Sequence, residues 1–235
     1  VTFCVMFTIP FLYFAIKYEE EKDLENIGFF RLLEEHGKAL TYLIFLFMGF
    51  VVAFSFWYIV FEDGNQNFKA QIETYCLINR PNNFDQCISD YGIGHDKSPT
   101  GFSSARTKVV NIFMNNIYVL IFTLFFSLIF GAGAIFILAW NASVIASAIG
   151  IFSKGSLSKL PLAIGRYMIH GLPEIASYFI GALAGGIVSV AIIKHDIKSD
   201  KFWTILQDSL NLIIVAVIIL FIASLIEVFI TPALF

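Results

Sequence analysis

The sequence predicts an all-α membrane protein, a polytopic transmembrane helical bundle of about six spans, and three observations lead to this fold class. Of the 235 residues, 58% are hydrophobic and only 14% are charged, whereas soluble domains are about a quarter charged. The mean hydropathy is +0.79. Several apolar runs are about 20 residues long, the length that crosses a hydrocarbon core of about 30 Å. The formal net charge of −3 indicates no basic surface and argues against a nucleic-acid partner.

The amino-terminal part predicts a separate region at 1–39. Residues 1–16 are apolar and would form about 24 Å of helix, so we interpret them as the end of a truncated span. Residues 17–39 are highly charged with interspersed Leu, Ile and Phe. They predict a helical connector, either on the membrane surface or in solution. The membrane domain is expected at 40–235.

The next two segments predict a span and an outer loop. Residues 40–61 form an uninterrupted apolar run with Trp57 near one end as an interfacial anchor. Residues 62–108 are polar and predict a loop that contains Cys76 and Cys87. A disulfide between them would place this loop outside the cell, in an oxidising compartment. The alternative is two free thiols.

The segment 109–152 is too long for one ordinary span. Gly131 and Gly133 lie at its midpoint, so we expect a hairpin of two spans near 109–130 and 134–152. The alternative is one long tilted helix followed by a short interfacial helix.

The number of spans in this segment sets the predicted orientation. With two spans, residues 17–39 and 194–208 are cytoplasmic, and both 153–168 and the carboxyl terminus are outside. With one span, the last two helices would invert.

The run 168–193 predicts the next span. Pro173 favours a helix that begins close to it, after a turn at 170–172 and a short basic interfacial loop at 153–166. Four small residues at four-residue steps form a stripe for close helix packing: Ser177, Gly181, Gly185 and Ser189.

The last span is expected at 210–230, after the polar segment 194–208. Glu227 breaks this span near its end, and Pro232 closes it.

Polar side chains in these spans predict the candidate site. His170 and Glu174 are four residues apart and share one helix face. In the predicted topology, further polar residues open or end neighbouring spans at the outer side. The predicted polar intramembrane cluster is His170, Glu174, Glu227, Asn115, Asn116 and Asn141. Glu174 could be only a capping charge at the helix dipole, part of a structural polar cluster, or part of a reactive or transport site.

No catalytic set is recognisable in the sequence. It contains no Gly-rich phosphate loop and no Ser in a nucleophile elbow. One His with two acids is a weak metal signature. We therefore expect no catalytic residues, no metal and no cofactor.

Five short motifs occur in a specific order along 40–235. They are Asn115-Asn116, Gly131 with Gly133, Asn141, His170-Gly171 with Glu174, and Ile226-Glu227 with Pro232. This order resembles the stage II sporulation protein M family of integral membrane proteins. The resemblance implies a non-enzymatic membrane scaffold or a permease component. The namesake in spore formers is a membrane partner of cell-wall hydrolases.

Three functional hypotheses follow. The first is a non-enzymatic scaffold or partner in a membrane complex. The second is a transporter or permease component with an outer-leaflet polar site. The third is an intramembrane hydrolase in which Glu174 is the general base and His170 its partner. The expected partners are the lipid bilayer and other membrane or envelope proteins, and the oligomeric state stays open.

Overall fold

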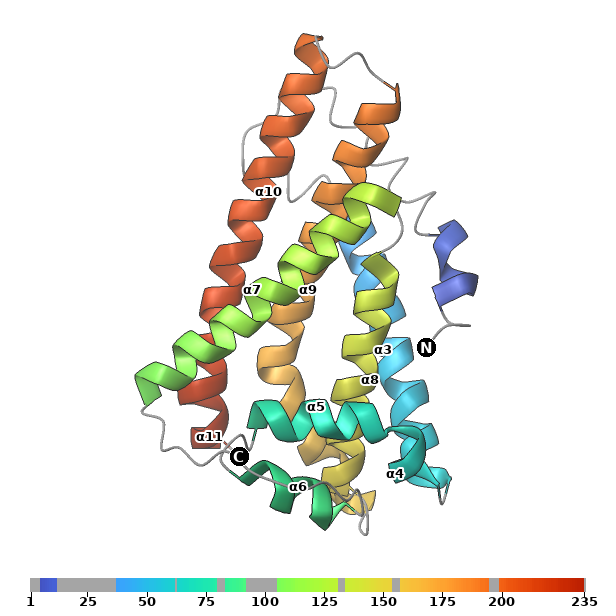
Figure 1. Ribbon diagram of the computed structural model, residues 1–235, viewed down its shortest axis with the longest axis vertical. Coiled ribbons are helices and arrows are strands. Elements are labelled where there is room, and N and C mark those ends of the chain that lie inside the picture. Colours follow the sequence, from blue (N-terminus) through green and yellow to red (C-terminus); the bar gives the residue numbers. More distant parts are fainter. Residues whose placement is uncertain are drawn as a thin grey trace. The chain divides into compact units, whose positions relative to one another are not determined.

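The computed structural model describes residues 5–11, 37–61, 63–79, 83–91, 105–130, 134–153, 157–194 and 199–234. All regular structure in these ranges is helical (Figure 1). Five of the described helices are long and apolar enough to cross a membrane. The candidate spans are Leu40–Val60, Lys108–Ile129, Ile135–Ser153, Leu160–Ile193 and Asp200–Leu234. The prediction of an all-α bundle of membrane helices is confirmed.

The amino-terminal predictions lie largely outside the described residues. Within the first span predicted at 1–16, residues 5–11 are helical. The charged connector predicted at 17–39 is not described before Gly37, where α3 (Gly37–Val60) begins.

The chain divides into two compact units, and each combines parts of several helices. The first unit comprises Val1–Phe47, Phe113–Ala139 and Leu172–Ala223, and the second comprises Met48–Ile112, Trp140–Gly171 and Ser224–Phe235. We describe each unit by itself.

In the first unit, α9 (Leu160–Lys194) and α10 (Asp200–Leu225) lie side by side (Figure 1). Buried side chains of both helices join them in one apolar cluster, made of Leu183, Ile187, Ala191, Phe202 and Ile205. Helix α7 (Ala105–Phe130) crosses them, and its Phe113 ring contacts Phe221 edge-on at 5.7 Å between centroids. The first unit is therefore a packed set of apolar helices.

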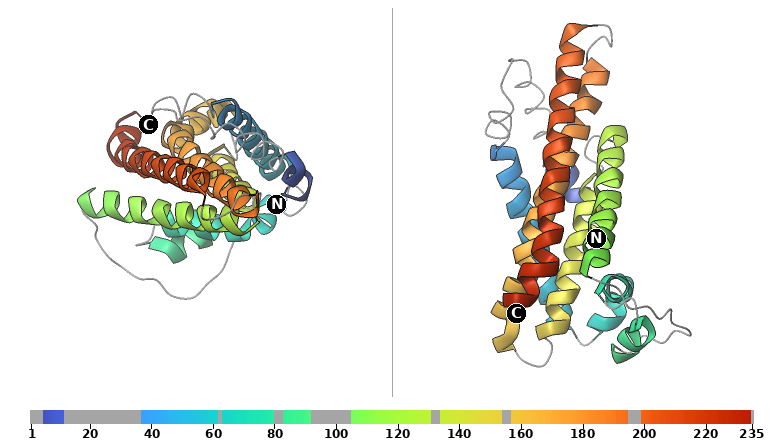
Figure 2. Two further views of the ribbon diagram at one scale, coloured as in Figure 1. Left: turned by 90° about the horizontal axis from the view of Figure 1, so that it is seen from above. Right: turned by 90° about the vertical axis from the view of Figure 1, so that its left-hand side faces the viewer.

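In the second unit, the predicted polar loop at 62–108 is wrong for much of its length. It contains three helices, α4 (Gly64–Asn67), α5 (Lys69–Asn79) and α6 (Phe84–Asp90). Phe68, Ile72 and Cys76 recur every four residues, so they share one face, and this face is buried in an apolar cluster. Helix α5 runs across α8 (Ala134–Ser153) and not along it (Figures 1 and 2).

The predicted hairpin at 109–152 agrees with the structure. Helix α7 ends at Phe130 and α8 begins at Ala134, and each contains a candidate span. The alternative of one long tilted helix is wrong.

The predicted start of the next span near Pro173 is wrong, as is the interfacial loop at 153–166. A short 3-10 turn, Leu157–Lys159, leads into α9 at Leu160, and Pro173 lies inside this helix. A turn at 170–172 would leave backbone groups unpaired in hydrocarbon, whereas a continuous helix pairs nearly all of them. The membrane therefore favours the helix in spite of the proline.

The last helix also differs from its prediction. It begins at Asp200, ten residues earlier than expected, where the Ser199 hydroxyl accepts a hydrogen bond from the Phe202 N–H at 3.2 Å. This bond is a typical N-cap. Glu227 does not break the helix, because a π-helical turn at Ile226–Ile230 continues it into α11 (Thr231–Leu234). Pro232 lies within α11 and does not end it.

Candidate functional site

An amide–carboxyl pair joins α7 to α9 in the first unit. Asn116 is buried, and its Nδ2 donates to Glu174 Oε1 at 2.5 Å. An acid within a membrane helix is expensive unless it has a polar partner or stays protonated. The structure therefore gives Glu174 a partner on a neighbouring helix, as expected for a structural polar contact.

Close packing along the small-residue stripe positions this pair. All four stripe residues are buried. A Cβ built on Gly181 would overlap the Leu120 side chain, and a Cβ on Gly185 would lie 2.8 Å from the Leu124 carbonyl oxygen. Between these points, the Ser127 hydroxyl donates to the Ala182 carbonyl oxygen at 2.5 Å. The glycines therefore let α7 approach α9 closely enough for Asn116 to reach the acid.

A second polar contact, in the second unit, involves His170. Its Nδ1 lies 3.1 Å from Thr231 Oγ1, and this hydroxyl donates to the Ile226 carbonyl oxygen at 3.2 Å. Because the hydroxyl has one proton and gives it to Ile226, Nδ1 is the donor to Thr231. The Thr231 backbone N–H also bonds to the Ile226 carbonyl oxygen. His170 thus holds the π-helical turn of the last helix.

The remaining predicted residues occupy different environments. Glu227 lies half-buried in that same π-helical turn, next to the Ile226 carbonyl. Asn141 is half-buried in α8. Asn115 is exposed on α7, although its neighbour Asn116 is buried. The six residues are therefore divided between the units, and their action as one site stays a prediction.

Sequence reasoning missed Thr231, which carries the contact to His170. No local pattern indicates this contact, because it joins residues that are 61 positions apart. A second missed contact joins α5 to α8, where Gln71 Nε2 donates to Ser143 Oγ at 3.2 Å.

The predicted cysteine pair forms a disulfide that links α5 to α6. The Cα atoms of Cys76 and Cys87 are 5.8 Å apart, and both side chains are fully buried. Asn65 adds a second link, since its Oδ1 accepts from the Tyr58 hydroxyl at 2.7 Å and its Nδ2 donates to the Tyr91 carbonyl oxygen at 3.0 Å. These contacts make α4, α5 and α6 a packed cap in the second unit.

Within the described ranges, no three His, Cys, Asp or Glu side chains lie close enough together to hold a metal ion. The hydrogen bonds of Asn116, Ser127, His170 and Gln71 join different helices, and their evident chemical effect is to fix helix positions.

Comparison with known families identifies the fold family. A family model described as stage II sporulation protein M matches residues 39–232. The chain belongs to the stage II sporulation protein M family. The match includes every motif on which the resemblance depended, from Asn115-Asn116 to Pro232, and begins next to the predicted domain boundary. No curated protein and no solved structure is significantly similar to the chain.

Proposed function

We propose that this protein is a multi-pass protein of the cell membrane that acts as a non-enzymatic scaffold in a membrane complex. The observation that carries the proposal is the engagement of its intramembrane polar groups with one another. Glu174 Oε1 accepts from Asn116, and His170 Nδ1 bonds to Thr231. Polar groups used in this way stabilise a helix arrangement.

The exposed face of α7 supports a partner helix. Asn115, Tyr118, Phe122, Phe125 and Ile129 are exposed and follow a spacing of three and four residues. This 3.5-residue repeat is typical of a helix–helix seam, in which one Asn sets the register. Asn115 lies seven residues inside the span that begins at Lys108, or about 10 Å along the helix. At that depth an amide side chain is more stable when it is hydrogen-bonded to a partner helix than when it faces lipid.

The orientation is part of the same proposal. The predicted loop at 62–108, with its disulfide-linked cap of α4, α5 and α6, would face the outside of the cell, because disulfides persist in oxidising compartments. Residues 17–39 and 194–208 would then be cytoplasmic. The two separate helices α7 and α8 give the even number of crossings that this arrangement needs.

The two alternatives make different demands on the same residues. A hydrolase needs His170 and Glu174 to activate one water together, and here each contacts a different side chain. A permease needs a water-filled path to an acid. None of the contacts described above favours such a path.

Partner capture from native membranes tests the scaffold proposal. The full chain would be extracted in mild detergent, and proteins that copurify would be quantified for wild type, Asn115→Leu and the control Val110→Leu. Val110 is also exposed on α7, but it carries no amide. We expect at least one stoichiometric partner in wild type and in the control, and its loss in Asn115→Leu. A monomer without partners that alone moves a solute across liposomes would overturn the proposal.

A further inference from the structure

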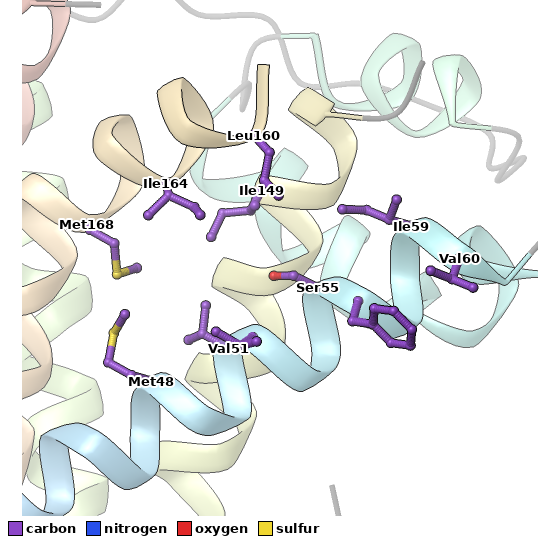
Figure 3. Close-up of a pocket in the computed structure, with 11 residues that line it drawn as sticks. Met48, Val51, Ser55, Ile59, Val60, Ile149, Leu160, Ile164 and Met168 are labelled. Atoms are coloured by element: carbon purple, nitrogen blue, oxygen red, sulfur yellow. The ribbon is translucent and has the colours of Figure 1, made fainter. Parts of the chain in front are cut away.

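The second unit contains an apolar groove between α3 and the first turns of α9, with α8 behind it (Figure 3). Its volume is about 340 Å³, and all but one of the eleven side chains around it are apolar. Val51 and Ile149 are buried at its floor, whereas Val52 and Phe56 at its rim are 63% and 62% exposed. The groove therefore opens sideways, and for a membrane helix the surroundings are lipid.

The one polar side chain in the groove is Ser55. It is only 8% exposed, and its hydroxyl has no hydrogen-bond partner among the described residues. Figure 3 shows the hydroxyl pointing into the space between α3 and the α8 and α9 side chains. A buried donor without an acceptor is unfavourable. An occupant of the groove that offers an acceptor oxygen would remove this penalty.

The length of the groove matches one leaflet of a bilayer. Along α3 its lining residues run from Met48 to Val60, and the part from Met48 to the level of Trp57 is about 14 Å long at 1.5 Å per residue. One leaflet contributes about 15 Å of hydrocarbon. Trp57 marks the headgroup level as an interfacial anchor, so Ser55 lies just inside it. At that depth the hydrocarbon chains of a lipid join its headgroup.

The volume of the groove favours a hydrocarbon chain over a protein helix. The groove holds about 340 Å³. A helix about 10 Å wide occupies roughly 1,400 Å³ over a length of about 18 Å. Met48 and Met168 line the end of the groove that is farther from Val60 (Figure 3). Methionine side chains are flexible and adapt readily to a flexible ligand.

A cation lies at the interfacial end. Lys159 is exposed and directly precedes Leu160, which lines the groove. A lysine at headgroup level attracts an anionic phosphate.

We propose that this groove binds one hydrocarbon chain of an anionic glycerophospholipid. The Ser55 hydroxyl donates to the linkage oxygen at the top of the chain, and Lys159 lies beside the phosphate. The bound lipid fills the space between α3 and α9 and so completes the second unit.

Photocrosslinking of the purified full chain tests the proposal. Ile164, which lines the groove, is replaced by p-benzoylphenylalanine, and Ile121, exposed on α7, is replaced in the same way as the control. Both variants are reconstituted with deuterated diacyl phosphatidylglycerol, extracted, washed in detergent and illuminated. We expect a lipid adduct at position 164, where the bound lipid survives the detergent wash. We expect no lipid adduct at position 121, where the wash removes the lipid before illumination.

Two further substitutions assign the contacts. Val51→Phe fills the floor and abolishes the adduct at position 164. Ser55→Ala removes only the hydroxyl and lowers the adduct about five-fold, the effect of one hydrogen bond. Ser55→Ala keeps the proposal testable even if the Val51→Phe variant does not fold.

Three results would overturn the proposal. The first is an equal yield of lipid adduct at positions 164 and 121. The second is a crosslink to protein in place of lipid at position 164. The third is a yield of lipid adduct at position 164 that Ser55→Ala leaves unchanged. The scaffold test depends on Asn115 on α7, whereas this test reads a lipid adduct in the groove between α3 and α9, so either proposal can fail without the other.

Discussion

Substitution of Gly185 by alanine tests the close approach of α7 and α9. The new Cβ would lie 2.8 Å from the Leu124 carbonyl oxygen and 3.1 Å from Ser127 Cβ. Carbon–oxygen contacts rarely fall below about 3.3 Å, so backbone atoms have to move by about 0.5 Å. Overpacking of this kind costs about 1–3 kcal/mol, and the loss of glycine from a helix returns about 0.5–1 kcal/mol. We expect Gly185→Ala to lower the free energy of unfolding by about 1–2 kcal/mol.

Gly49 supplies the matched control. It lies within α3, is exposed, and has nothing within 4 Å of a Cβ built on it. Gly49→Ala should therefore raise the free energy of unfolding by up to about 1 kcal/mol, because only the helix propensity changes. Both variants would be unfolded by a denaturing detergent from mixed micelles, with helix content followed by circular dichroism.

The opposite signs are the decisive feature of this experiment. If Gly185→Ala is as stable as wild type, or both substitutions shift stability in the same direction, then the glycine stripe does not set the distance between α7 and α9.

Three further predictions concern the polar contacts. In a double-mutant cycle of Asn116→Leu and Glu174→Leu, the two residues should be coupled by about 1–2 kcal/mol in unfolding free energy; additive effects would contradict the hydrogen bond between them. Thr231→Val should lower unfolding stability by about 1–2 kcal/mol, since it removes the hydroxyl that bonds the histidine and the π-helical turn, while Thr231→Ser should restore most of it. Cys76 and Cys87 should react with a membrane-impermeant maleimide on intact cells only after reduction; labelling without reductant, or only after cell lysis, would refute the outer disulfide.

The local pattern identified much of the candidate site. The acid, its four-residue spacing from His170 and the amide pair at 115–116 were all visible in the sequence. Which amide turns inward was not visible, because the two are adjacent in one helix and only packing against α9 buries Asn116. Thr231 was missed because its contact to His170 joins residues that are 61 positions apart.

The sequence by itself determined the fold class, the approximate positions of the five described spans, the candidate cysteine pair and the family, because each depends on local hydropathy or on short motifs in order. Only the tertiary structure decided the course of the chain at Pro173 and Glu227, where the need to pair every backbone group in hydrocarbon outweighs local signals that break helices. It also decided that the described part of 62–108 forms the helices α4, α5 and α6, since Phe68, Ile72 and Cys76 become a buried face only when a partner surface covers them. The groove at Ser55 depends on three helices that are distant in sequence, so no local pattern could reveal it.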